Sequence, residues 1–117
     1  MKIIGKKMNV QHKDLAAGRW NSLSFFEQMA NVGSEVERAI KWREKRNAQY
    51  SQMAFERALE LLDFTVADEK NKKRLKELLR LREVLADYFA FENSYQASDK
   101  SFQNYFAAFN YAARKGL

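Results

Sequence analysis

Residues 25–46 read FFEQMANVGSEVERAIKWREKR, and this stretch decides the fold class. Its apolar residues recur at spacings of three and four, which places them along one face of a helix. Ser24 is followed three residues later by Glu27, a capping-box pattern that starts a helix. The stretch therefore predicts a long amphipathic helix. Its apolar face consists of Phe26, Met29, Gly33, Val36 and Ile40.

The same periodicity returns in three later segments, at residues 49–67, 70–91 and 100–114. Each segment therefore predicts another amphipathic helix. Their apolar faces consist of Phe55, Leu59, Leu62 and Val66 in the first, of Leu75, Leu78, Leu79, Leu85 and Phe89 in the second, and of Phe102, Tyr105, Phe106, Phe109 and Ala113 in the third.

Long helices joined by short connections must lie antiparallel to their neighbours. The chain has no proline and only 4 glycines, so it lacks the residues that tight β-turns need. We therefore predict an all-α fold, an antiparallel up-down four-helix bundle. The bundle spans residues 22–117, and residues 1–21 form a basic N-terminal arm.

The sequence lacks the residues that most catalytic and metal sites require. There is no cysteine, and the single histidine, His12, lies in the predicted arm. Glu56, Glu60 and Asp63 follow the spacing of metal sites in bundles, but di-iron sites also need Glu-x-x-His pairs. No phosphate-binding glycine loop and no Ser/His/Asp set is present. We therefore expect a protein that is not an enzyme and that holds no metal or cofactor.

No run of about 18 apolar residues occurs in the chain, so we expect no membrane span. The absence of cysteine is compatible with a reducing compartment. We therefore expect a cytoplasmic protein.

Basic residues gather at one predicted end of the bundle. Five of them crowd the start of the third helix, where the helix dipole favours acids. An up-down bundle brings the end of the fourth helix and the end of the arm to the same place. We therefore predict a nucleic-acid-binding surface at this end, with an ordinary solvated helix start as the alternative. The predicted surface consists of Arg19, Lys70, Lys72, Lys73, Arg74, Lys76, Arg114 and Lys115.

A smaller basic and aromatic patch is predicted at the opposite end. An aromatic ring flanked by cations can stack on an unpaired base while the cations hold phosphate. The alternative is that Trp42 contacts Tyr50 across the turn between the first two helices. The patch consists of Lys41, Trp42, Arg43, Lys45 and Arg46.

The second predicted helix is apolar on two faces, and both must be buried. The second face is covered either by another subunit or by the same chain. It consists of Tyr50, Met53, Leu61 and Phe64. On the third helix, Arg82 lies within the apolar arc. We expect it to pair with Glu37 or Glu60, with an anionic ligand as the alternative.

Two segments carry a family resemblance, GSEVERAI at residues 33–40 and FERALELLDF at residues 55–64. In a basic four-helix chain of this length, they resemble the bacterial four-helix-bundle group. That group includes the 23S rRNA intervening-sequence proteins and the accessory variability determinants of diversity-generating retroelements. The resemblance implies a barrel-like homopentamer whose positive surfaces bind RNA or DNA and, in the retroelement proteins, a reverse transcriptase.

The hypothesis from the sequence is a non-catalytic, oligomeric helical accessory protein that binds RNA or single-stranded DNA through phosphate contacts. A second hypothesis is an interaction scaffold for an acidic or nucleic-acid-handling partner, such as a reverse transcriptase. A third is a regulatory or antitoxin-like partner of an enzyme.

Overall fold

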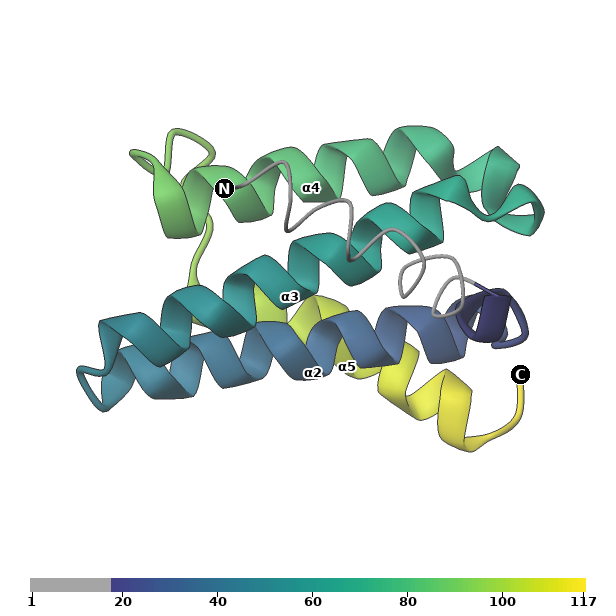
Figure 1. Cartoon of the computed structure of the whole chain (residues 1–117), viewed down its shortest axis with the longest axis horizontal. Coiled ribbons are helices and arrows are strands. Elements are labelled where there is room, and N and C mark those ends of the chain that lie inside the picture. The colour runs from purple at the N-terminus through teal and green to yellow at the C-terminus, as the bar shows by residue number, and fades with distance from the viewer. Residues whose placement is uncertain (1–17) are drawn as a thin grey trace, which may run out of the picture.

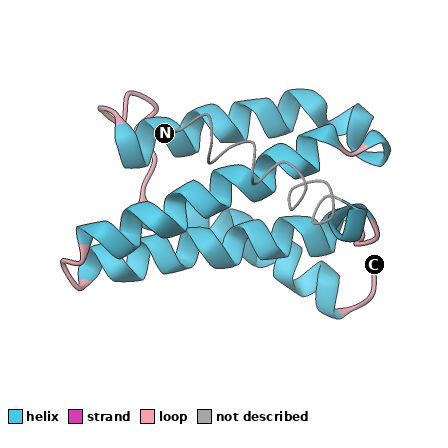
Figure 2. Ribbon diagram, viewed as in Figure 1, coloured by secondary structure: helices cyan, strands magenta, loops and turns pink. Residues whose placement is uncertain are grey.

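The computed structural model describes residues 18–117, and this part of the chain is all helical (Figures 1 and 2). The predicted all-α fold class is confirmed. A short helical turn at residues 18–21 precedes four long helices, and a 3-10 helix leads into the third of them. The elements are α2 (Phe25–Glu44), α3 (Ala48–Ala67), η1 (Glu69–Arg74), α4 (Leu75–Ala90) and α5 (Asp99–Arg114).

Helix α2 begins at the predicted capping box. The hydroxyl of Ser24 accepts a hydrogen bond from the backbone amide of Glu27, whose carboxylate accepts one from the amide of Ser24. Near the turn between α2 and α3, the Ser51 hydroxyl at the start of α3 donates to the carbonyl of Ala39 late in α2, at 2.7 Å. The intervening turn places Arg46 in the left-handed region, at φ 61°.

Helix α5 packs on α2 at a glycine. A Cβ atom on Gly33 would lie 2.8 Å from side-chain atoms of Phe106. Only a residue without a side chain allows this close approach. The two helices therefore meet where the ring of α5 rests against the backbone of α2.

The core lies between α2, α3, α4 and α5, with α2 contributing the largest share. Helix α4 packs on α3, and it meets α5 through aromatic side chains, with the rings of Tyr88 and Phe102 5.1 Å apart. A hydrogen bond of 2.7 Å from the Tyr105 hydroxyl of α5 to the Glu77 carboxylate of α4 also joins the two helices. Burial, followed by the adjacent Glu77 carboxylate, raises the pKa of Tyr105. No helix within residues 18–117 is long and apolar enough to span a bilayer.

Two boundaries differ from those predicted. Trp20, assigned to the arm, is only 8% exposed and belongs to the core, so the folded body includes residues 18–21. Residues 70–74, predicted as the start of an α-helix, form part of the 3-10 helix η1. The tighter turn places Asn71 in the interior, where it is 2% exposed. Residues 1–17 of the predicted arm lie outside the described part of the chain.

Candidate nucleic-acid interface

The fold brings the predicted binding residues from separate elements to one end of the molecule. Phe25, the first residue of α2, contacts Phe109 near the end of α5, with ring centroids 5.7 Å apart. The guanidinium of Arg74, at the junction of η1 and α4, lies 4.2 Å from the centre of the Phe25 ring. The start of α4 and the end of α5 therefore share this end, as Figure 1 shows. We call the eight predicted cations the basic end.

A buried polar cluster supports the basic end from beneath. The Gln28 amide donates to the Trp20 carbonyl at 2.9 Å and to the Asp68 carboxylate at 2.8 Å. The side-chain amide of Asn71 donates to the Gln28 oxygen at 2.8 Å and to the Thr65 carbonyl at 2.9 Å. The Trp20 indole donates to the Thr65 hydroxyl at 2.9 Å. These bonds join residues 18–21, α2, α3 and η1, and so fix the position of η1.

One cation of the basic end belongs to this support. The Lys70 ammonium pairs with the buried Asp68 carboxylate and donates to the Asn21 carbonyl at 2.9 Å. Burial alone would raise the pKa of Asp68, but hydrogen bonds from Lys70 and Gln28 and the charge of Lys70 outweigh it, so the pKa is lowered. Lys70 therefore stabilises the fold and is not available to a phosphate.

The remaining cations are exposed. Lys72, Lys73, Lys76 and Arg114 form no ion pair with another residue of the described chain. The Lys115 ammonium lies 5.6 Å from the ring centre of Tyr111. Cations without a protein carboxylate keep their capacity to bind an external anion.

Tyr111 adds an aromatic side chain that is not among the predicted binding residues. It is 55% exposed on the last turns of α5, beside Arg114 and Lys115. The signal in the sequence is its position four residues before Lys115, outside the apolar face of its helix. An exposed ring beside cations is the arrangement on which unpaired bases stack.

The basic and aromatic residues predicted as a patch at the opposite end do not form one continuous surface that is free to bind a ligand. Trp42 meets Tyr50 edge to face at 4.9 Å, so the predicted alternative of a ring contact across the turn is confirmed. Lys45 lies 5.2 Å from the Trp42 ring centre, and Lys41 is 3.8 Å from the Glu37 carboxylate. Arg46 is exposed at the turn.

Arg43 of this patch links the end of α2, on which it lies, to the end of α4 and the start of α5. Its guanidinium pairs with Asp99 at the start of α5 and donates to the Tyr88 hydroxyl of α4 at 2.9 Å. Tyr88 in turn donates to Asp99. Burial lowers the pKa of Arg43, but Tyr88 and Asp99 outweigh that effect and leave it raised. Arg43 is therefore a structural residue.

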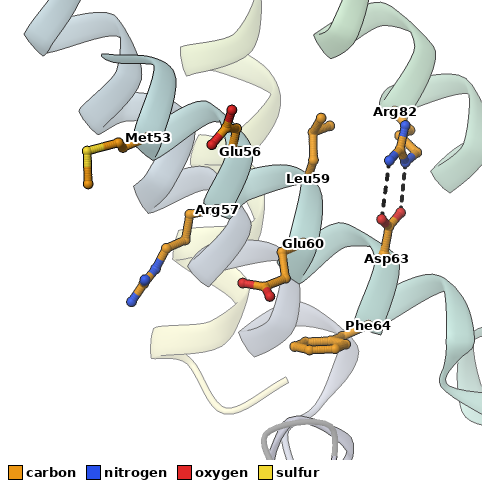
Figure 3. Close-up of a pocket in the computed structure, with 8 residues that line it drawn as sticks. All are labelled: Met53, Glu56, Arg57, Leu59, Glu60, Asp63, Phe64 and Arg82. Atoms are coloured by element: carbon orange, nitrogen blue, oxygen red, sulfur yellow. Dashed lines mark hydrogen bonds and ion pairs between the residues drawn. The ribbon is translucent and has the colours of Figure 1, made fainter. Parts of the chain in front are cut away.

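The predicted interface residues on α3 divide into two pairs. Tyr50 and Met53 are 47% and 57% exposed, whereas Leu61 and Phe64 are partly buried against the core of the same chain. Met53 and Phe64 line a groove of about 540 Å³ that runs along α3 and reaches Arg82 of α4 (Figure 3). The second face of α3 is thus covered by its own chain at one end and exposed at the other.

The predicted partners of Arg82 are wrong. Its guanidinium donates two hydrogen bonds to the Asp63 carboxylate, at 2.7 and 3.2 Å, on the wall of this groove (Figure 3). The side chain is 40% exposed. The hydrogen bond to Asp63 raises the pKa of Arg82 more than partial burial lowers it. Arg82 therefore links α3 to α4 at the surface.

Within residues 18–117, no cluster of three or more His, Cys, Asp or Glu side chains has the arrangement of a metal site. Comparisons of the chain with protein families, with curated proteins and with solved structures find no match.

Proposed function

We propose that this chain is a non-catalytic, homo-oligomeric accessory protein of the cytoplasm that binds RNA or single-stranded DNA through the basic end. The observation that carries the proposal is the convergence of unpaired cations from η1, α4 and α5 on one end of the fold. The proposed framework is an antiparallel up-down four-helix bundle. The proposed activity needs no metal or cofactor.

The position of the cations favours an anionic partner. Lys72, Lys73 and Arg74 precede the first residue of α4, and Lys76 follows it. The amide groups of a helix start already carry partial positive charge, so cations there reduce helix stability. Arg74 at the N-cap provides no side-chain hydrogen bond to these amides. Phosphate groups would relieve both the mutual repulsion and the unfavourable dipole interaction.

The exposed ring of Tyr111 favours single strands over duplexes. A base stacks on an exposed aromatic ring, and the Tyr111 side chain is 55% exposed beside Lys115. Base stacking is tolerant of sequence because every base has a π-face. We therefore expect binding with little preference for sequence.

The exposed apolar side chains of α3 favour a second candidate function. Met53 is 57% exposed and lines the groove that runs along α3. Exposed apolar surface of this kind is typical of protein contacts. In this alternative, the chain is a scaffold for an acidic or nucleic-acid-handling partner, such as a reverse transcriptase.

Fluorescence anisotropy with a labelled oligouridylate at several salt concentrations tests the proposal. The triple variant Lys72→Glu, Lys73→Glu, Lys76→Glu should weaken binding and flatten the salt dependence. Each lost phosphate contact should reduce the slope of log affinity against log salt by about 0.7. The variant should stay folded, because exposed charges contribute little to stability.

A matched triple variant with the same charge change at the opposite end, Lys41→Glu, Lys45→Glu, Lys100→Glu, is the control. Equal weakening by both triple variants would contradict a localised basic end. Full binding by the first variant, together with loss of binding on deletion of residues 1–13, would assign binding to the arm. No binding by the parent near 50 mM salt would reject the function in favour of the scaffold.

A further inference from the structure

The groove of about 540 Å³ that runs along α3 exposes apolar surface (Figure 3). Met53 is 57% exposed in it, and Leu59 and Phe64 are only partly buried. At 1.5 Å per residue, these side chains extend over about 16 Å of the helix. Exposed apolar surface that is continuous along a helix is typical of a docking site.

The two arginines that line this groove already have carboxylate partners. Arg82 pairs with Asp63, as Figure 3 shows, and Arg57 lies 3.7 Å from Glu35 of α2. These arginines are therefore not available to neutralise the other carboxylates of the groove.

The other carboxylates of the groove belong to Glu56 and Glu60, which are both exposed. Glu56 accepts a hydrogen bond from the Gln52 amide at 3.1 Å. Neither glutamate forms an ion pair with another residue among 18–117. They are four residues apart and so lie one turn apart on the same side of α3. The groove therefore favours an occupant that is both apolar and positively charged.

The described part of the chain begins beside one end of this groove. The Trp20 indole donates to the Thr65 hydroxyl at 2.9 Å, and Thr65 directly follows Phe64 of the groove. Residues 1–17 come before this point in the chain. At about 3.3 Å per residue they can reach about 56 Å, whereas the groove extends only about 16 Å along α3. The N-terminal segment is therefore long enough to occupy the groove.

Residues 2–8 read KIIGKKM and match the groove in chemistry. Ile3 and Ile4 are large apolar residues, and Lys6 and Lys7 add two adjacent positive charges. The sequence has no acidic residue before Asp14. The segment thus combines apolar and cationic side chains, whereas the groove combines apolar and anionic ones.

We propose that residues 2–8 dock in the groove along α3 of the same chain. The two isoleucines of the segment contact the apolar side chains of the groove, and its two lysines pair with Glu56 and Glu60. A short flexible connection gives the segment an effective concentration on the order of millimolar at the groove, so individually weak contacts suffice. This tether favours the chain's own segment over a separate partner.

Docking has a consequence for the arm. Its lysines would contact carboxylates of the protein and not phosphates, which leaves nucleic acid to the basic end. The inference goes beyond the proposed function, because it concerns the chain without any ligand.

Paramagnetic relaxation in the ¹⁵N-labelled full chain, without nucleic acid, tests the docking. The chain has no cysteine, so Asn9→Cys gives a single attachment site for a nitroxide directly after the docking segment. Amide signals of residues 53–64 should lose most of their intensity and recover it when the nitroxide is reduced. Signals of α5, which packs on α2, should keep theirs.

Charge reversal tests the proposed ion pairs in the same labelled chain. Glu56→Lys combined with Glu60→Lys should abolish the loss of intensity, because the groove then repels the segment. Adding Lys6→Glu and Lys7→Glu to this variant should restore the loss, since opposite charges again face each other. The amide spectrum itself reports whether each variant remains folded.

Two matched controls separate docking from general effects. Glu44→Lys combined with Glu92→Lys makes the same charge change at exposed positions away from the groove and should leave the loss of intensity unchanged. Met53→Gln should reduce the loss by making the groove more polar. Phe91→Gln should not reduce it, although Phe91 is more exposed at 75%.

No loss of intensity at residues 53–64, or an equal loss in every helix, would overturn the proposal. Failure of the fourfold charge reversal to restore the loss would also overturn it. A mixture of ¹⁵N-labelled chain without nitroxide and unlabelled chain with nitroxide identifies docking between copies. If residues 53–64 lose as much intensity in this mixture, the segment docks on a second copy and the proposal is rejected. Because these measurements contain no nucleic acid, their failure leaves the proposed function to its own test.

Discussion

Replacing Gln28 by methionine removes the centre of the polar cluster beneath the basic end while keeping a side chain of similar shape. Three hydrogen bonds are lost, to the Trp20 carbonyl, the Asp68 carboxylate and the Asn71 amide. A neutral bond contributes about 0.5–1.5 kcal/mol and a bond to a charged group about 1.5–3 kcal/mol. Gln28 is fully buried, so water cannot replace its bonds. We expect a loss of about 3–5 kcal/mol in the free energy of unfolding.

Urea denaturation followed by circular dichroism measures this loss. The matched control is Gln52→Met on the exposed side of α3, where the amide donates to Glu56 at 3.1 Å. The control should change the free energy of unfolding by less than about 0.5 kcal/mol. A cost below about 1 kcal/mol for Gln28→Met would refute the reasoning that this cluster holds the basic end together.

Three further predictions concern the backbone and pH. Gly33→Ala should destabilise the fold by about 1–3 kcal/mol in urea, because the new methyl group collides with Phe106, whereas Gly18→Ala, which meets nothing within 4 Å, should not. The free energy of unfolding should fall as the pH drops from about 4 through the lowered pKa of Asp68. Urea titrations at each pH should show a weaker pH dependence for Asp68→Asn. Arg46→Gly should raise the free energy of unfolding by about 0.5–1 kcal/mol, because glycine adopts positive φ without strain; an unchanged urea midpoint would contradict this.

Local features of the fold could be predicted from the sequence. The all-helical class follows from periodicity, and the capping box at Ser24 and Glu27 is present as expected. The contact of Trp42 with Tyr50 also follows from their positions around a short turn. These features depend on residues close together in the chain.

The polar cluster could not be predicted because its partners are distant in sequence. Gln28 and Asn71 are 43 residues apart, and a glutamine or asparagine is usually exposed. One signal was present: Gln28 lies beside Met29 on the apolar face of α2, where a polar residue needs buried partners.

The ion-pair partners of the arginines could not be predicted from the spacing of apolar residues, because that spacing does not give the relative positions of the helices. Arg82 pairs with Asp63 and not with Glu60. Which acid it meets depends on how α3 is rotated about its axis and shifted along it relative to α4. Arg43 lies in a run of basic residues, but the fold places it beside Tyr88 near the end of α4 and Asp99 at the start of α5. A run of cations in sequence therefore does not identify which of them remain available to a ligand.

Titration of the ¹⁵N-labelled full chain with an oligouridylate at about 50 mM salt, followed by amide chemical shifts, tests the central claim most directly. We expect shifts concentrated in residues 70–76 and 111–115, with the shifts disappearing as salt is raised. Shifts confined to residues 41–46 or to residues 1–17, or no shifts at any oligonucleotide concentration, would contradict the assignment of nucleic-acid binding to the basic end.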